Sequence, residues 1–80
     1  MSENFSDVLS DVIKIIGATG NVMGLTPDQD FYDAGVTSVL ALPILLELED
    51  QFQVSIPDDL FIAARTARAM ADVITKLQQG

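Results

Sequence analysis

The sequence predicts an all-α fold, a four-helix bundle in which three helices are long, the third is short and a long loop follows the first. Apolar residues recur at the spacing of an amphipathic helix near both ends of the chain, over about residues 3–16 and 67–77. Between them, residues 39–52 have helical length, contain no glycine and are rich in strong helix formers. The brief alternation of Val54 and Ile56 ends at Pro57 and is too short to pair as a strand. These observations favour helices around one modest core.

Composition limits the possible functions. Eighty residues suffice for one domain with a single core, expected to span residues 1–80. Hydrophobic residues make up 49% of the chain, so it is expected to fold despite a net charge of −8. Cysteine and histidine are absent, which removes thiolate chemistry and the side chain most used for acid–base catalysis near neutral pH. We therefore expect neither an enzyme nor a metal site.

The charges are unevenly distributed. Residues 1–63 carry eleven acids against one base, whereas residues 64–80 carry three bases against one acid. An anionic body repels nucleic acid and anionic lipid surfaces but attracts basic proteins, so we expect a monomer with protein partners. An acidic amino terminus and the lack of an apolar run of about 20 residues favour a cytoplasmic location.

The first helix is predicted over about residues 3–16, with Ser2 as its N-cap. Gly17 and Gly20 are expected to end this helix, because glycine is the usual residue beyond a helix terminus. The apolar residues of the helix share one face, which should pack on the core. This face consists of Phe5, Val8, Leu9, Val12 and Ile16.

Residues 17–36 show no clear periodicity and are predicted to form an ordered loop with one helical turn at residues 30–33. Its acids, Asp28, Asp30 and Asp33, do not have the EF-hand spacing, because the sixth position would be Asp33 and not glycine. Solvated carboxylates are the preferred interpretation, and weak association with a divalent ion is the alternative. The side chains expected to anchor the loop to the core are Val22, Met23, Leu25, Phe31 and Tyr32.

The second helix is predicted over residues 39–52, with Ser38 as its N-cap and an apolar stripe on each of two faces. The stripe that suits a core consists of Leu40, Ala41, Ile44, Leu45, Leu48 and Phe52. The opposite stripe consists of Val39, Leu42, Pro43 and Leu46, flanked by the acids Glu47, Glu49 and Asp50. An apolar surface edged by acids is typical of a docking site for a basic protein. The alternative is a helix buried on both faces, although so small a chain has few elements to cover the second.

The remaining chain predicts two further helices. Asp58 or Asp59 is expected to cap the short third helix, which should end near Ala63. Thr66 is expected to cap the last helix, whose outer face should hold an ion pair between Asp72 and Lys76. The core face of this helix is predicted to consist of Met70, Val73, Ile74 and Leu77.

Several motifs follow one another in the order found in a known family. An acidic and aromatic turn at residues 30–33 and then Gly35 precede Ser38, and an acidic, apolar helix follows. Residues 56–59 then read Ile-Pro-Asp-Asp, ahead of the cap residue Thr66. Over nearly its whole length the chain resembles the acyl carrier proteins and related phosphopantetheine-binding carriers, which implies a bundle of acyl-carrier type and a single carrier domain.

The resemblance implies a carrier and not a catalyst. A phosphopantetheinyl transferase would move 4′-phosphopantetheine from coenzyme A to the oxygen of Ser38, and the arm would hold its cargo as a thioester. The commonest family signature there is Asp-Ser-Leu, whereas this chain has Thr37, Ser38 and Val39, so the usual contact of the aspartate with the transferase is missing. Partner enzymes that carry basic surfaces would dock on a set of carrier residues, namely Val39, Leu42, Pro43, Leu46, Glu47 and Asp50. A plain helix cap is the alternative role for Ser38.

Three functions are compatible with these residues. The first is a stand-alone acyl carrier of fatty acid or polyketide type, in a specialised lipid or secondary-metabolite pathway, served by a loading ligase and acyl-processing enzymes. The second is an aminoacyl carrier loaded by a dedicated amino acid ligase, because the Phe-Tyr-x-Ala-Gly run at residues 31–35 is similar to small carriers of amino acids. The third, from another class, is a helical adaptor that binds one partner and is never modified.

Overall fold

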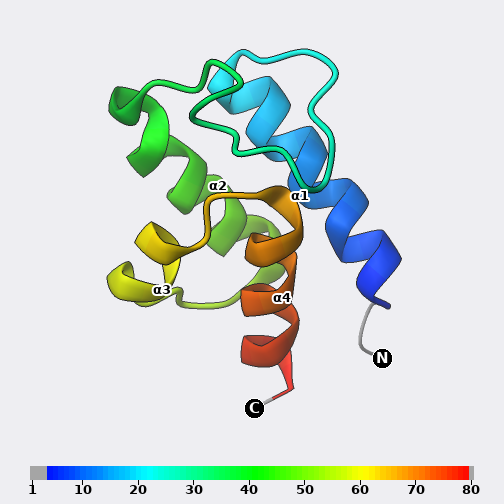
Figure 1. The fold of residues 1–80 in the computed structure, drawn as a ribbon. Coiled ribbons are helices and arrows are strands. Elements are labelled where there is room, and N and C mark those ends of the chain that lie inside the picture. The colour runs from blue at the N-terminus through cyan, green and yellow to red at the C-terminus, as the bar shows by residue number, and fades with distance from the viewer. Residues whose placement is uncertain (1–3, 80) are drawn as a thin grey trace.

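The computed structural model describes residues 4–79 and confirms the all-α bundle (Figure 1). Helix α1 spans Phe5–Gly20, α2 spans Ala41–Phe52, the short α3 spans Asp58–Ala63 and α4 spans Ala67–Gln78. A 3-10 turn, η1, spans Ser38–Leu40 and leads directly into α2. The start of α2 lies at the end of the bundle opposite the two termini (Figure 1). Within the described residues no helix combines the length and apolar character that crossing a membrane requires.

Helix α1 begins at Phe5 because Asn4 is its N-cap, with the Asn4 side chain accepting a hydrogen bond from the Asp7 amide at 2.9 Å. The predicted cap, Ser2, lies outside the described residues. The predicted core face is largely confirmed. Val8, Val12 and Ile16 are fully buried, whereas Phe5, at the margin, is partly exposed.

The predicted end of α1 near Ile16 is wrong, because the helix continues through Gly17 and has Gly20 as its last residue. Asn21 then ends it in the left-handed conformation, with φ of 59°. Gly20 is buried, and a Cβ atom there would lie only 2.7 Å from a methyl group of Val36. Gly20 therefore lets the long loop pack closely on the end of α1, and this contact offsets the poor helix propensity of glycine.

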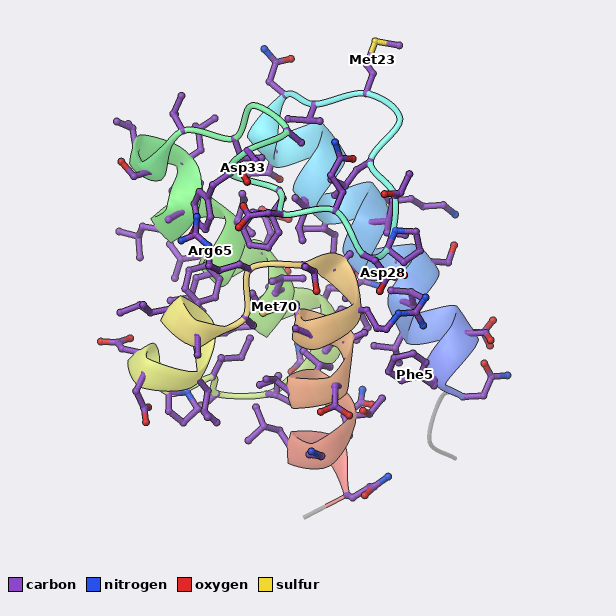
Figure 2. The ribbon with its side chains drawn as sticks, viewed as in Figure 1. Phe5, Met23, Asp28, Asp33, Arg65 and Met70 are labelled. Atoms are coloured by element: carbon purple, nitrogen blue, oxygen red, sulfur yellow. The ribbon has the colours of Figure 1, made fainter. Side chains whose placement is uncertain are left out.

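The long loop between α1 and η1 is anchored mainly as predicted. Leu25 and Phe31 are buried, and Val22 and Tyr32 pack against the core. Met23 is the exception, because its side chain is 97% exposed and points into solvent at the tip of the loop (Figure 2). Val36, which the sequence analysis did not single out, is the anchor nearest to Ser38, and it packs beside Gly20.

The start of the second helix differs from the prediction. Thr37 occupies the cap position, Ser38 is the first residue of the η1 turn, and regular α-helix begins only at Ala41. Pro43 explains the difference. In a helix that started at Val39, the amide of residue 43 would donate a hydrogen bond to the Val39 carbonyl, but proline has no N–H to donate. With the 3-10 turn first, Pro43 falls in the first turn of α2, where an amide has no helical partner.

The last two helices follow the prediction except at one cap. Pro57, not Asp58 or Asp59, occupies the N-cap position of α3. Both acids therefore lie within the first turn, where their negative charges interact favourably with the positive end of the helix dipole. Thr66 caps α4 through a hydrogen bond of 3.0 Å from the Ala69 amide, as predicted. The predicted pair of Asp72 and Lys76 forms at 3.0 Å. On the core face of α4, Met70 and Ile74 are buried, and Val73 and Leu77 pack against the core.

Candidate functional site

Ser38 is exposed at the point where the long loop meets the helical part of the chain. Two buried side chains flank this point, Val36 two residues before Ser38 and Ile44 one turn into α2. Thr37, Ser38 and Val39 are all exposed between them. The serine is therefore exposed on a segment that is anchored to the core on both sides.

The turn at residues 30–35 sets the direction in which the chain reaches Ser38. The predicted helical turn is present, because the Ala34 amide donates to the carbonyl of Asp30 at 3.0 Å. The Asp30 side chain also accepts hydrogen bonds from the amides of Tyr32 and Asp33, at 2.9 and 3.1 Å. Gly35 completes the turn with φ of +128°, a backbone conformation that favours glycine, and its amide donates to the carbonyl of Tyr32 at 3.1 Å.

Arg65 ties the long loop to the connection between α3 and α4, and Arg68 ties it to the first turn of α4. Nε of Arg65 lies 2.7 Å from Oδ2 of Asp30, and Nε of Arg68 lies 2.7 Å from Oδ1 of Asp28. Backbone hydrogen bonds of 3.0 Å join the same segments, from the Phe31 amide to the carbonyl of Arg65 and from the Arg68 amide to the carbonyl of Pro27. The interpretation of Asp28 and Asp30 as solvated loop carboxylates is incomplete, because their side chains are 74% and 25% exposed but each also forms an ion pair with an arginine. Each faces an arginine, and their contacts give no support for a shared cation.

These ion pairs also change the titration of the two acids. The hydrogen bond from Arg65, followed by that from the Asp33 amide, lowers the pKa of Asp30 below its ordinary value. The hydrogen bond from Arg68 lowers the pKa of Asp28 in the same way. Both carboxylates are therefore charged and paired at neutral pH. The sequence analysis missed these pairs, and the only local signal was that two of the four basic residues occur together after α3.

The two stripes of the second helix are separated as predicted. On the inner stripe, Ile44 and Leu48 are fully buried. On the outer stripe, Val39, Leu42 and Leu46 are 82%, 61% and 55% exposed. This exposure excludes the alternative of a helix buried on both faces. The structure therefore leaves a row of large apolar side chains uncovered, beginning beside Ser38.

The acids predicted to flank the outer stripe have different roles. Glu47 and Asp50 are exposed, so their charges are free to meet a partner. Glu49 instead accepts a hydrogen bond of 2.8 Å from the Ile56 amide and so holds the loop after α2. The η1 turn and the first turn of α2 contain no acid. The surface next to Ser38 is thus apolar, and negative charge enters only toward the carboxyl-terminal end of α2.

The environment of Ser38 fits a phosphate ester. Residues 34–46 contain no acidic side chain that would repel its charge. The amides of Ser38 and Val39 precede the first bonded amide of the turn, that of Leu40, which donates to the carbonyl of Thr37 at 3.0 Å. Free amides at the start of helical structure favour a negative group. Ser38 could therefore hold a phosphodiester without displacing any buried side chain.

A separate cavity of about 390 Å³ lies between the start of α1 and the start of α4. Phe5 and Asp28, which line it, lie on the same side of the molecule in Figure 2. None of the predicted site residues contributes to its lining, and its charged groups already form ion pairs within the chain. Its lining residues are Phe5, Asp28, Thr66, Arg68, Ala69 and Asp72.

Comparisons with known proteins give one family match. A comparison with curated proteins finds no match. Residues 5–74 match the protein family described as the phosphopantetheine attachment site. The match covers α1, the long loop, η1, α2 and α3 completely, and α4 as far as residue 74. The chain therefore belongs to the phosphopantetheine-binding family of carrier proteins, which are not enzymes and which bear a 4′-phosphopantetheine arm.

Proposed function

We propose that Ser38 is the attachment point of the arm and that residues 1–80 act as a single cytoplasmic acyl carrier domain. The observation that carries this proposal is the exposed Ser38 between two buried anchors, beside the uncovered outer stripe of α2. Among residues 4–79, none of the other serines (Ser6, Ser10 and Ser55) lies at the start of a helix beside a row of exposed large apolar side chains. We propose a specialised lipid or secondary-metabolite pathway, because Thr37 and Pro43 depart from the pattern of ordinary fatty acid carriers.

The chain's own chemistry at this site is limited to supplying one oxygen. The arm provides a terminal thiol, which a chain without cysteine lacks. A serine hydroxyl is a weak nucleophile without a base, and residues 34–46 contain no titratable side chain. The transferase must therefore supply the group that takes the proton from Oγ of Ser38, while the carrier holds the hydroxyl in place.

The partners of this carrier follow from the surface beside Ser38. A transferase that reaches Oγ must cover Val39 and Leu42, the nearest exposed members of the outer stripe. An enzyme with a larger footprint would also meet Leu46, Glu47 and Asp50. We therefore propose that the transferase contact is mainly apolar. Loading and processing enzymes would add basic residues that face the two acids.

Intact mass measurement tests the attachment site. The purified chain is incubated with coenzyme A and a broad-specificity phosphopantetheinyl transferase, and the mass should increase by one arm. The Ser38→Ala variant should show no increase, whereas Ser55→Ala, at another exposed serine, should be modified like the wild type. Because the Ser38 side chain is not the helix cap, its loss should lower the free energy of unfolding by less than the ~1 kcal/mol typical of a cap. Modification of Ser38→Ala would refute the assignment.

An aminoacyl cargo is the second candidate. It is supported by the run at residues 31–35 and by the absence of acids from the first turns after Thr37. The cargo can be identified by purifying the carrier from its native cells and measuring the mass of the group that hydroxylamine releases from the arm. A fatty or polyketide acid would support the acyl carrier, and an amino acid would support the second candidate.

A further inference from the structure

Asp30 links the segment between α3 and α4 to the turn that precedes Ser38. Its two carboxylate oxygens have separate roles. Oδ1 accepts hydrogen bonds from the amides of Tyr32 and Asp33, at 2.9 and 3.1 Å. Oδ2 accepts the hydrogen bond from Nε of Arg65 at 2.7 Å. The orientation that lets Oδ1 cap the turn is therefore fixed by the contact of Oδ2 with Arg65.

Arg65 is itself held by several contacts with the same turn. Its carbonyl accepts a hydrogen bond of 3.0 Å from the Phe31 amide, and its guanidinium carbon lies 4.8 Å from the centre of the Tyr32 ring. A guanidinium over an aromatic face gains a favourable cation–π interaction. Figure 2 shows Arg65 on the same side of the molecule as Asp33, whose amide donates to Oδ1 of Asp30. An isolated exposed ion pair contributes little, but these contacts act on one short segment together.

The turn is connected to Ser38 by an unbroken series of short contacts. The Gly35 amide donates to the carbonyl of Tyr32 at 3.1 Å, and the Val36 amide donates to the carbonyl of Phe31 at 3.0 Å. Val36 is buried against the end of α1, and Ser38 follows two residues later. A change in the turn would therefore shift the backbone that presents Ser38.

Arg68 provides a natural comparison, because its pair with Asp28 has the same Nε to oxygen distance of 2.7 Å and the two arginines are similarly exposed, at 50% and 53%, although Asp28 is more exposed than Asp30. Asp28, however, accepts hydrogen bonds only from Arg68 among the described residues, so it caps no turn. It also precedes the turn at residues 30–35. Loss of this second pair would loosen the loop without releasing the segment that leads to Ser38.

We infer that Arg65 is a positioning residue for the modification of Ser38. Through Asp30, it keeps the turn at residues 30–35 in the form that presents the serine to the transferase. This inference rests on the proposed attachment at Ser38. It makes an arginine between α3 and α4 a determinant of a reaction at the carboxyl-terminal end of the long loop.

Transfer kinetics test the inference with two variants that break the same contact from either side. Arg65→Ala removes the guanidinium, and Asp30→Asn keeps an oxygen for the turn amides but cannot pair with Arg65. If the competent turn is then populated in about a third to a tenth of molecules, KM of the carrier should rise about threefold to tenfold with kcat unchanged. Arg65→Lys should recover part of the loss, because it keeps the charge without the planar guanidinium.

The charges of these variants exclude a simple electrostatic explanation. Arg65→Ala makes the carrier more negative, whereas Asp30→Asn makes it less negative, so a charge effect on association would change KM in opposite directions. A positioning effect raises KM in both. Arg68→Ala is the control and should leave KM within about twofold of the wild type, a change worth less than 0.5 kcal/mol.

Amide hydrogen exchange supplies a measurement that needs no transferase. Exchange at Gly35 and Val36 should be faster in Arg65→Ala and Asp30→Asn than in the wild type, and unchanged in Arg68→Ala. Faster exchange with raised KM supports the inference. Normal KM in Arg65→Ala, or an equal rise in Arg68→Ala, would overturn it while leaving attachment at Ser38 intact. A wild-type chain that is never modified at Ser38 would overturn both.

Discussion

The two faces of α2 use the same kinds of side chain for opposite purposes. Ile44 and Leu48 are fully buried, and they join α2 to the core. Leu42 and Leu46, of equal hydrophobicity, remain more than half exposed on the outer face. Burial of the first pair stabilises the fold, whereas exposure of the second pair carries a solvation penalty that only a partner can remove. Residue type alone therefore does not separate stability from recognition in this helix, but position on the helix does.

The largest expected difference between the faces is in stability. Leu48→Ala should lower the free energy of unfolding by about 2–5 kcal/mol, because it leaves a cavity among buried side chains. Leu46→Ala makes the same chemical change on the outer face and should stay within about 0.5 kcal/mol of the wild type. Urea unfolding of the two variants under identical conditions measures both values. Equal losses would mean that the outer face is also part of the core.

A second change tests how tightly the inner face is packed. In Gly20→Ala the new methyl group would lie 2.7 Å from a Val36 methyl group and 3.4 Å from Cδ1 of Ile44. Overpacking of this kind should lower the free energy of unfolding by about 1–3 kcal/mol.

The matched control for this change is the double variant Gly20→Ala with Val36→Ala. The second substitution removes the Val36 methyl groups that the new methyl group at position 20 would otherwise contact too closely. Its measured loss should be smaller than the sum of the two single losses. Strict additivity would show that Gly20 and Val36 do not compete for the same space.

On the outer face the expected effect is on function and not on stability. Leu46→Asp should weaken modification and cargo loading, because a charge replaces an apolar contact, while the melting temperature stays close to that of the wild type. Glu47→Lys should weaken partner association mainly at low salt, since exposed charges act on the association rate. Loading rates and unfolding curves from the same samples separate the two effects. A collapse of the fold in Leu46→Asp would place that residue in the core.

The smallest effect concerns Asp28 and Asp30, which belong to neither face of α2. The pKa values of both carboxyl groups in the folded chain lie below the ordinary 3.8. The charged carboxylates therefore stabilise the fold above that pH, and this stabilisation is lost as the pH falls through the pKa values of the folded state. The melting temperature should therefore fall below about pH 4 as these pairs are lost. In the double variant Arg65→Gln with Arg68→Gln, the difference from the wild type should be largest near neutral pH and disappear in acid. A difference that persists unchanged in acid would rule out this linkage.

The sequence by itself determined the features that depend on neighbours within one or two helical turns. The periodic spacing of apolar residues predicted the inner and outer stripes of α2, because residues three and four apart share a helix face. Thr66 predicted the start of α4, and Asp72 and Lys76 predicted an ion pair, for the same local reason. The position of Ser38 on the exposed border of loop and helix followed from the family resemblance together with these patterns.

The tertiary structure decided the features that depend on contacts between distant segments. Gly17 was expected to end α1, but the helix continues to Gly20, where the distant Val36 packs against it. The partners of Asp28 and Asp30 lie 40 and 35 residues further along the chain, a separation at which no periodic pattern operates. Pairing of this kind requires the loop and the α3–α4 connection to be brought together first. It therefore depends on the packed core, which forms from the chain as a whole.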